Sequence, residues 1–216
     1  MPGRLIVFEG VEGAGKTTQL QRLCRRLDRI GIENSPFREP GGTVLGDEIR
    51  SLLLQPGNAV APSSEALLFM ASRAQLIEER VRPALARGHV VLLDRFFLST
   101  YAYQVVGRRL EEDGVRAANA LAVGDLVPDV TILLMLSVSE GMARVGRRGA
   151  RDRMESEPEL FHVRVEGAFA AFDDPAWQKS HPEAGPIVAI DASGEPDGVE
   201  ERVWQAVAAA CPEVQG

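Results

Sequence analysis

The chain has 216 residues, 45% of them hydrophobic and 25% charged, which matches one globular domain and leaves little room for a second. Its net charge of −7 argues against a general nucleic-acid-binding protein, because neutralising many backbone phosphates needs a broad basic surface. The two cysteines lack the spacing of a zinc site or a disulfide framework. No apolar run reaches the length of a signal peptide or a membrane span, so we expect a cytoplasmic protein without a membrane partner.

Predicted strands and helices alternate along the chain. The apolar runs 5–8, 90–93, 130–136 and 187–190 are predicted strands, and a further short strand is predicted at 34–38, before Pro40-Gly41-Gly42. Helical periodicity covers 20–30, 45–54 and 64–86. This alternation predicts an α/β fold with a central parallel sheet of about five strands and helices on both faces. Ligands bind beyond the carboxyl ends of the strands in such sheets. Gly10 and Asp94 come just after the runs 5–8 and 90–93, and Arg38 ends the segment 34–38.

A complete phosphate-binding motif follows the first predicted strand. Its residues are Gly10, Val11, Glu12, Gly13, Ala14, Gly15, Lys16 and Thr17, followed by Thr18, and they fit Gly-x4-Gly-Lys-Ser/Thr. The glycines let backbone N–H groups turn toward a phosphate at a helix N-terminus, where the helix dipole favours negative charge. Lys16 adds a full charge, and the Thr17 hydroxyl suits Mg²⁺. The motif predicts a nucleoside triphosphate site, but it does not distinguish a kinase from a GTPase switch, an ATPase motor or a sensor.

An aspartate and an arginine follow the third predicted strand. Asp94 is able to bind Mg²⁺ through water, and Arg95 is able to bind a phosphate with two hydrogen bonds, which a lysine cannot match. The alternative is a salt bridge that only ends the strand. A second positive group, at 144, 147, 148, 151 and 153, concentrates charge locally, although such runs are more often solvated helix faces.

Together these motifs resemble the thymidylate kinase family almost end to end. The matching pieces are Phe8-Glu9 with the phosphate loop, Arg38-Glu39-Pro40-Gly41-Gly42-Thr43, residues 67–73, Asp94-Arg95, Ala102-Tyr103-Gln104, Pro128-Asp129 and Asp152-Arg153. The resemblance implies a three-layer P-loop kinase fold in one domain, 1–216, that transfers a phosphoryl group from ATP, with Mg²⁺, to dTMP. It also implies a homodimer.

The same resemblance implies roles for the acceptor-site residues. Phe69 would stack on the thymine base, and Arg73, four residues later on the same helix face, would donate to its O4 carbonyl. An isolated pair of this kind would otherwise be read as a core ring and a surface charge. The other implied contacts are Arg38 and Arg95 on the acceptor phosphate, Ser99 and Gln104 on the base, Tyr103 at the 2′ position of the sugar, and Glu12 near its 3′-hydroxyl.

A mobile lid is implied for residues 141–156. The acceptor is already an anion, so the transfer needs cations that align two charged groups more than it needs a strong base. Family members with an arginine in the phosphate loop take a catalytic cation from it, whereas this chain has Gly13 there. We therefore expect Lys16, Arg95 and Arg153 to be the catalytic cations, with Arg148 or Arg151 assisting, and Glu12 as the acidic catalytic residue.

Three positions depart from the family pattern, and two alternative functions stay open. Val105-Val106 replaces a glycine-rich stretch, Met135 stands where aspartate is frequent, and Phe172 stands where tyrosine is common. These departures bear on base preference and rate more than on the type of reaction. The alternatives are another nucleoside monophosphate or deoxynucleoside kinase, and a nucleotide-dependent regulatory switch, although the Asn-Lys-x-Asp and Leu-Ser-Gly-Gly-Gln motifs of GTPases and transporters are missing.

Overall fold

The computed structural model describes residues 2–145 and 152–215, and within them five parallel strands form one sheet. The strands are β1 (Arg4–Gly10), β2 (Asn34–Arg38), β3 (Val90–Asp94), β4 (Val130–Met135) and β5 (Ile187–Asp191). Their order across the sheet is β2-β3-β1-β4-β5. The predicted strands and the predicted parallel sheet are therefore confirmed, with bounds that differ by two residues at most.

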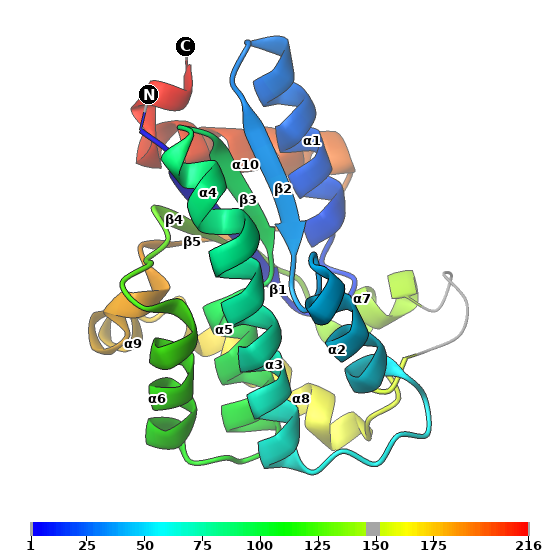
Figure 1. Ribbon diagram of the computed structural model, residues 1–216. Helices are drawn as coiled ribbons and strands as arrows, with labels where there is room; N and C mark the ends of the chain where they lie inside the picture. The colour runs from blue at the N-terminus through cyan, green and yellow to red at the C-terminus, as the bar shows by residue number, and fades with distance from the viewer. Residues whose placement is uncertain (1, 146–151, 216) are drawn as a thin grey trace.

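Helices cover both faces of this sheet (Figure 1). The α-helices are α1 (Lys16–Arg29), α2 (Val44–Leu54), α3 (Pro62–Leu76), α4 (Arg82–Ala86), α5 (Phe97–Thr100), α6 (Glu112–Val123), α7 (Val138–Val145), α8 (Glu159–Ala171), α9 (Pro175–Ser180) and α10 (Pro196–Ala210). Two π-helical turns, η1 (Ile77–Val81) and η2 (Tyr101–Gly107), and two 3₁₀ turns, η3 (Pro182–Ala184) and η4 (Pro212–Gln215), complete the elements. Helices α1 and α10 pack together on one face, while α4, α5 and α8 pack on strands from the other.

The helix predicted for 64–86 begins at Pro62 and continues to Ala86, but its middle is the π-helical turn η1. Pro83 lies just after this turn. Since proline has no N–H and its ring crowds the preceding turn, a regular α-helical pattern is interrupted there. The widened turn lets one long helix continue past the proline.

The core lies between the sheet and the two helix layers. Leu5, Ile6, Val7 and Phe8 of β1 are each at most 1% exposed, and Val90 to Leu93 of β3 are completely buried. Continuous apolar runs are required in these strands because both faces of a parallel sheet are covered. None of the helices in 2–145 and 152–215 is long and apolar enough to cross a membrane.

The strand register brings the residues at the strand ends to one edge of the sheet. Asp94 lies opposite Phe8 of β1 on one side and opposite Arg38 of β2 on the other. The phosphate loop leaves β1 at Gly10, two residues beyond Phe8. Residues 10–17, Arg38 and Asp94 therefore share one edge, as the alternating pattern of strands predicted.

Candidate active site

The phosphate loop runs from the end of β1 to the first turn of α1. Gly10, Gly13 and Gly15 have φ angles of 139°, 73° and 93°, which lie in the region that favours glycine. Lys16 is only 6% exposed, and its Nζ donates to the carbonyl oxygens of Gly10, at 2.9 Å, and Val11, at 2.8 Å. Burial and the charge of Arg95 lower the pKa of Lys16 to about 8. The loop therefore folds around a buried cation.

Thr17 and Asp94, from different elements, meet beside this loop. The Thr17 hydroxyl, in the first turn of α1, donates to Asp94 Oδ2 at the end of β3 over 2.5 Å. Hydroxyl and carboxylate oxygens are ligands that Mg²⁺ accepts, with water and nucleotide phosphates filling its remaining positions. Among the described residues no group of three or more His, Cys, Asp or Glu side chains is placed to hold a metal. The pair thus fits a Mg²⁺ ion that is held jointly by the protein and a nucleotide.

An ion pair between Arg95 and Glu12 joins β3 to the phosphate loop. Arg95 Nη1 also donates to Ser99 Oγ over 3.0 Å, and its guanidinium lies 5.2 Å from the centre of the Tyr103 ring. The Tyr103 hydroxyl donates to Glu12 Oε1 over 3.1 Å. Burial alone would raise the pKa of Glu12, but the charges of Arg95 and Lys16 outweigh it and lower that pKa to about 2. Four residues predicted for the site therefore lie together, around an ionised carboxylate.

Arg95 itself has a strained backbone. Its φ of 76° lies in the left-handed region, which costs a residue with a side chain about 1 kcal/mol or more. Its N–H donates to the carbonyl oxygen of Phe8 over 3.0 Å, which holds the turn against β1. Such strain is concentrated at functional sites, where the surrounding structure maintains it. The geometry of this turn is therefore consistent with a binding role for Arg95.

Glu9 supports the turn from below and was not among the predicted site residues. This carboxylate is fully buried, and it accepts hydrogen bonds from the Phe96 N–H at 2.7 Å and the Ser99 N–H at 3.0 Å. Its second oxygen accepts from Ser99 Oγ over 2.6 Å. The carboxylate thereby orients the segment that carries Arg95 and Ser99. A glutamate inside an otherwise apolar strand was the feature of the sequence that pointed to such a role.

Arg50 of α2 is a second residue that the sequence analysis missed. Its Nη1 donates to the Pro40 carbonyl oxygen over 2.9 Å. Burial and the positive charges of Arg38 and Arg95 lower the pKa of Arg50, which means that these three guanidinium groups act on one another. Arg38 is exposed at the end of β2, with Asp47 at 3.9 Å. The three arginines form a basic group beside the phosphate loop, suited to an anion.

Arg73 is more deeply buried than its predicted contact with a base suggests. It is 2% exposed, and it forms an ion pair of 2.6 Å with the buried Glu39. Its Nη1 donates to Thr100 Oγ1 at 3.0 Å and Asn119 Oδ1 at 2.6 Å, and its Nη2 donates to the Phe96 carbonyl oxygen at 2.9 Å.

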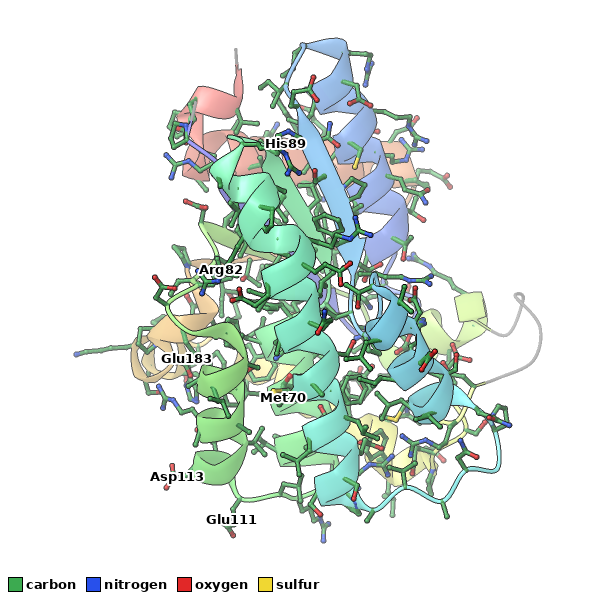
Figure 2. All side chains as sticks on the ribbon, viewed as in Figure 1. Met70, Arg82, His89, Glu111, Asp113 and Glu183 are labelled. Atoms are coloured by element: carbon green, nitrogen blue, oxygen red, sulfur yellow. The ribbon has the colours of Figure 1, made fainter. Side chains whose placement is uncertain are left out.

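With a further bond from Nε to Glu39, every N–H direction of Arg73 has a partner. The sulfur of Met70, labelled on α3 in Figure 2, lies 3.9 Å from Nη1 of Arg73. Phe69, also on α3, is half-buried. A contact between Arg73 and a base carbonyl would therefore require one of these bonds to be exchanged.

Gln104 lies in η2 and contacts a buried carboxylate that the sequence analysis also missed. Gln104 is 2% exposed, and its Nε2 donates to Oε1 of Glu65 over 3.0 Å. Glu65 is completely buried in the first turn of α3, four residues before Phe69. Because i and i+4 residues share a helix face, Glu65 and Phe69 lie on the same side of α3.

Arg153, the expected catalytic cation of the lid, contacts Leu53 and Glu65 in this structure. Its Nε donates to the Leu53 carbonyl oxygen and its Nη2 to Glu65 Oε2, both over 2.6 Å. Its side chain is 10% exposed. Arg153 makes these contacts because a buried carboxylate requires cationic partners, and Arg153 forms one of the ion pairs of Glu65. Arg147, Arg148 and Arg151 lie outside the described residues, so only the two ends of the predicted lid are described.

The departures from the family pattern lie in different surroundings. Val105 and Val106 are in η2 directly after Gln104, where Val105 packs against the core. Met135 is the last residue of β4 and also packs against the core. Phe172 is buried, with its ring 4.4 Å from that of Trp177. Of the three departures, the valine pair is therefore the one adjacent to a predicted base contact.

Comparisons with known proteins identify the family of this chain. A family model described as thymidylate kinase matches residues 8–188. The chain is 43% identical to the thymidylate kinase of Deinococcus radiodurans over 205 residues, which cover 95% of this chain and 96% of that protein. It is 46% identical to the thymidylate kinase of Pseudomonas fluorescens over 196 residues, which cover 89% and 93% of the two chains.

The fold is also similar to a solved structure. The crystal structure of thymidylate kinase from Ehrlichia chaffeensis matches with a TM-score of 0.75 and 27% identity, covering 96% of this chain and 100% of that chain. Sequence and structure thus agree over nearly the whole length, and the resemblance of the motifs is confirmed. The chain belongs to the thymidylate kinase family.

Proposed function

We propose that this chain phosphorylates dTMP to dTDP with ATP and Mg²⁺, and that the residues gathered at the ends of β1, β2 and β3 perform the transfer. The observation that carries the proposal is the meeting of three groups in a thymidylate kinase chain: the buried Lys16, the Thr17–Asp94 oxygen pair and the Arg95–Glu12 ion pair. Lys16 binds phosphates, the Thr17–Asp94 pair suits a divalent cation, and the Arg95–Glu12 pair joins the donor loop to the acceptor side.

The donor side is the phosphate loop. Its N–H groups, at the N-terminus of α1, bind the ATP phosphates. Lys16 exchanges its hydrogen bonds to the Gly10 and Val11 carbonyl oxygens for contacts with oxygens of the terminal phosphate of ATP. Thr17 and Asp94 would hold Mg²⁺, which would neutralise charge on the phosphates and orient them. Residues 10–18 together form the nucleotide site.

The acceptor side is the basic group beside the loop. Arg38, Arg50 and Arg95 bind the 5′-phosphate of dTMP, and Arg95 exchanges part of its contact with Glu12 for the phosphate. Glu12 remains ionised because of its low pKa, so it accepts a hydrogen bond from the 3′-hydroxyl of the sugar. Phe69 stacks on the thymine base while Tyr103 limits space at the 2′ position. Ser99, Arg73 and Gln104 complete the base and phosphate contacts.

Cations, and not a general base, carry the chemistry. Two unit charges at 4 Å repel each other by about 1 kcal/mol in water but by about 4 kcal/mol at the effective dielectric of a protein site. Lys16 and Arg95 offset this repulsion, and they do so most fully where charge builds up during the transfer. The acceptor oxygen is already an anion, so no proton has to be removed from it.

The lid, residues 141–156, supplies a further cation. Arg153 is the arginine proposed for this role, with Arg148 or Arg151 assisting, and Arg153 would exchange its contact with Glu65 to fill it. Comparing Arg148→Ala, Arg151→Ala and Arg153→Ala variants for turnover with saturating dTMP identifies the catalytic residue. An equal and small loss in all three would show that the lid provides no catalytic cation.

The function is tested with a panel of acceptors. Purified protein with Mg-ATP is given dTMP, dUMP, dCMP, dGMP, AMP or thymidine, and the release of ADP is measured. We expect dTMP to have the highest kcat/KM and Lys16→Met to abolish its turnover. Preference for another acceptor would assign the alternative kinase, and ATP binding without acceptor-dependent ADP release would assign the regulatory switch.

We propose that the enzyme works in the cytoplasm as a homodimer, and that its subunits contact each other through a face made by α2, α3 and α6. These helices pack side by side, with α3 in the middle (Figure 1). They carry exposed leucines, Leu52 at 53%, Leu67 at 61% and Leu121 at 89%. Several exposed leucines on neighbouring helices indicate a protein–protein interface. Light scattering should give twice the chain mass, and Leu67→Glu with Leu121→Glu should give the chain mass; a wild-type monomer would contradict the proposal.

A further inference from the structure

Five side chains from three segments form a polar cluster next to the acceptor site, and two of them, Glu65 and Gln104, are buried. This Glu65 cluster consists of Glu65, Gln104, Arg108, Arg153 and Glu157. Oε1 of Glu65 accepts from Gln104 Nε2 and from Arg108 Nε, each over 3.0 Å. Oε2 accepts from Arg108 Nη2 at 2.9 Å and from Arg153 Nη2 at 2.6 Å. Glu65 therefore has two hydrogen bonds on each oxygen.

Two arginines keep Glu65 in its ionised form. Burial would raise the pKa of Glu65, but the hydrogen bonds from Arg108, Arg153 and Gln104 outweigh it and lower that pKa. An ionised carboxylate accepts hydrogen bonds and cannot donate one. The amide of Gln104 must consequently turn its NH₂ group toward Glu65, and its carbonyl oxygen must point the other way. Among the described residues no donor reaches this oxygen.

We propose that Glu65 is a positioning residue for base selection: it orients the Gln104 amide so that the carbonyl oxygen accepts the N3–H of thymine. Thymine has a donor at N3, whereas cytosine has an unprotonated acceptor there. An amide held with its oxygen toward the base therefore binds thymine and repels cytosine. The inference rests on the proposed function, because it requires dTMP to bind next to Gln104.

A single substitution, Glu65→Gln, reverses this orientation. The carboxamide oxygen of the new side chain favours the position of Oε2, where two guanidinium groups donate, over that of Oε1, where one does, so its NH₂ takes the position of Oε1 and the hydrogen bond from Arg108 Nε is lost. That NH₂ faces Gln104, which must turn its oxygen toward it and its own NH₂ toward the base. A donor then meets the N3–H of thymine but suits the N3 of cytosine. We expect the ratio of kcat/KM for dTMP to that for dCMP to fall about tenfold or more.

Uracil provides an internal control, since it has the same N3–H and O4 groups as thymine. The dTMP to dUMP ratio should therefore stay within about twofold in Glu65→Gln. A general loosening of the site would lower both kcat/KM values without changing the dTMP to dCMP ratio. Glu157→Gln is the matched protein control, because it removes a carboxylate from the same Arg108 without touching Gln104, and it should keep the wild-type ratios.

A double-mutant cycle isolates the route through Gln104. In a Gln104→Leu background, Glu65→Gln should no longer change the dTMP to dCMP ratio, because the amide that it reorients is missing. The inference is overturned if active Glu65→Gln keeps the wild-type dTMP to dCMP ratio. It is also overturned if Glu157→Gln changes this ratio as much as Glu65→Gln does, or if Glu65→Gln changes it equally in the Gln104→Leu background. If Glu65→Gln does not fold, Gln104→Leu alone decides, since wild-type selectivity in that variant also overturns it. A wild-type protein that fails to phosphorylate dTMP would instead contradict the proposed function.

Discussion

Gly13 of the phosphate loop and Gly141 of α7 pack backbone against backbone, and this contact gives the sharpest prediction about stability. A Cβ atom added at Gly13 would lie 2.2 Å from the Gly141 carbonyl oxygen, and one added at Gly141 would lie 2.2 Å from the Glu12 carbonyl oxygen. Gly13 also has a φ of 73°. Gly13→Ala therefore introduces both a strained backbone and a clash with backbone atoms, which cannot move aside as a flexible side chain can.

The magnitude follows from the separate contributions. Left-handed φ costs a residue with a Cβ about 1–2 kcal/mol. Overpacking that forces a helix to shift costs about 1–3 kcal/mol more. We therefore expect Gly13→Ala to lower the free energy of unfolding by about 2–5 kcal/mol.

Two other glycines separate the strain from the clash. Gly15 has a φ of 93° with nothing within 4 Å of an added Cβ, so Gly15→Ala should cost only the strain, about 1–2 kcal/mol. Gly141→Ala carries the clash without a left-handed φ, and its gain of about 1 kcal/mol in helix propensity partly offsets the cost.

Urea unfolding at 25 °C, followed by tryptophan fluorescence, measures all three variants. Gly13→Ala should be the least stable, and the difference from Gly15→Ala should exceed 1 kcal/mol. Equal stabilities of Gly13→Ala and Gly15→Ala would refute the reasoning, because the clash would then have no cost. The same packing explains why a loop arginine is not accommodated at position 13 without displacing α7, and why the proposed extra cations come from the lid.

Three further predictions concern charged groups of the site. Burial and the charge of Arg95 lower the pKa of Lys16 to about 8, so its ammonium form is present below that pH and lost above it. We therefore expect kcat/KM for ATP to fall as the pH rises through about 8. A pH profile of kcat/KM that is flat to about pH 9.5 would contradict this. Arg73→Met leaves the buried Glu39 without its cation and should lower the free energy of unfolding, measured in urea, by about 3–5 kcal/mol. The control Arg116→Met breaks a half-exposed ion pair with Glu183 and should lower it by less than about 1 kcal/mol. Arg153→Ala should lower the stability by about 1–3 kcal/mol, since Glu65 loses one of its partners. A large loss of turnover at unchanged stability would show that Arg153 acts as a catalytic cation and adds little to the stability of the fold.

The features that the sequence predicted well are those encoded by contiguous residues. The phosphate loop is eight consecutive residues between a strand and a helix, so its glycines and Lys16 are placed by local backbone geometry. Strands β1, β3 and β4 were predictable for a similar reason, since burial on both faces requires unbroken apolar runs. The register of parallel strands then placed Asp94 beside the loop without any further information.

The partners of buried charges were decided by the tertiary structure alone. Glu65 and Arg50 lie in no motif, and the motif that contains Glu39 gave it no role; each acquires its role from groups that are distant in the sequence. Arg153 is a further example, because its motif predicted a catalytic cation but did not predict its contact with the buried Glu65. The physical reason is that a buried charge must find a partner across the fold, and hydrophobic periodicity does not specify which partner that is.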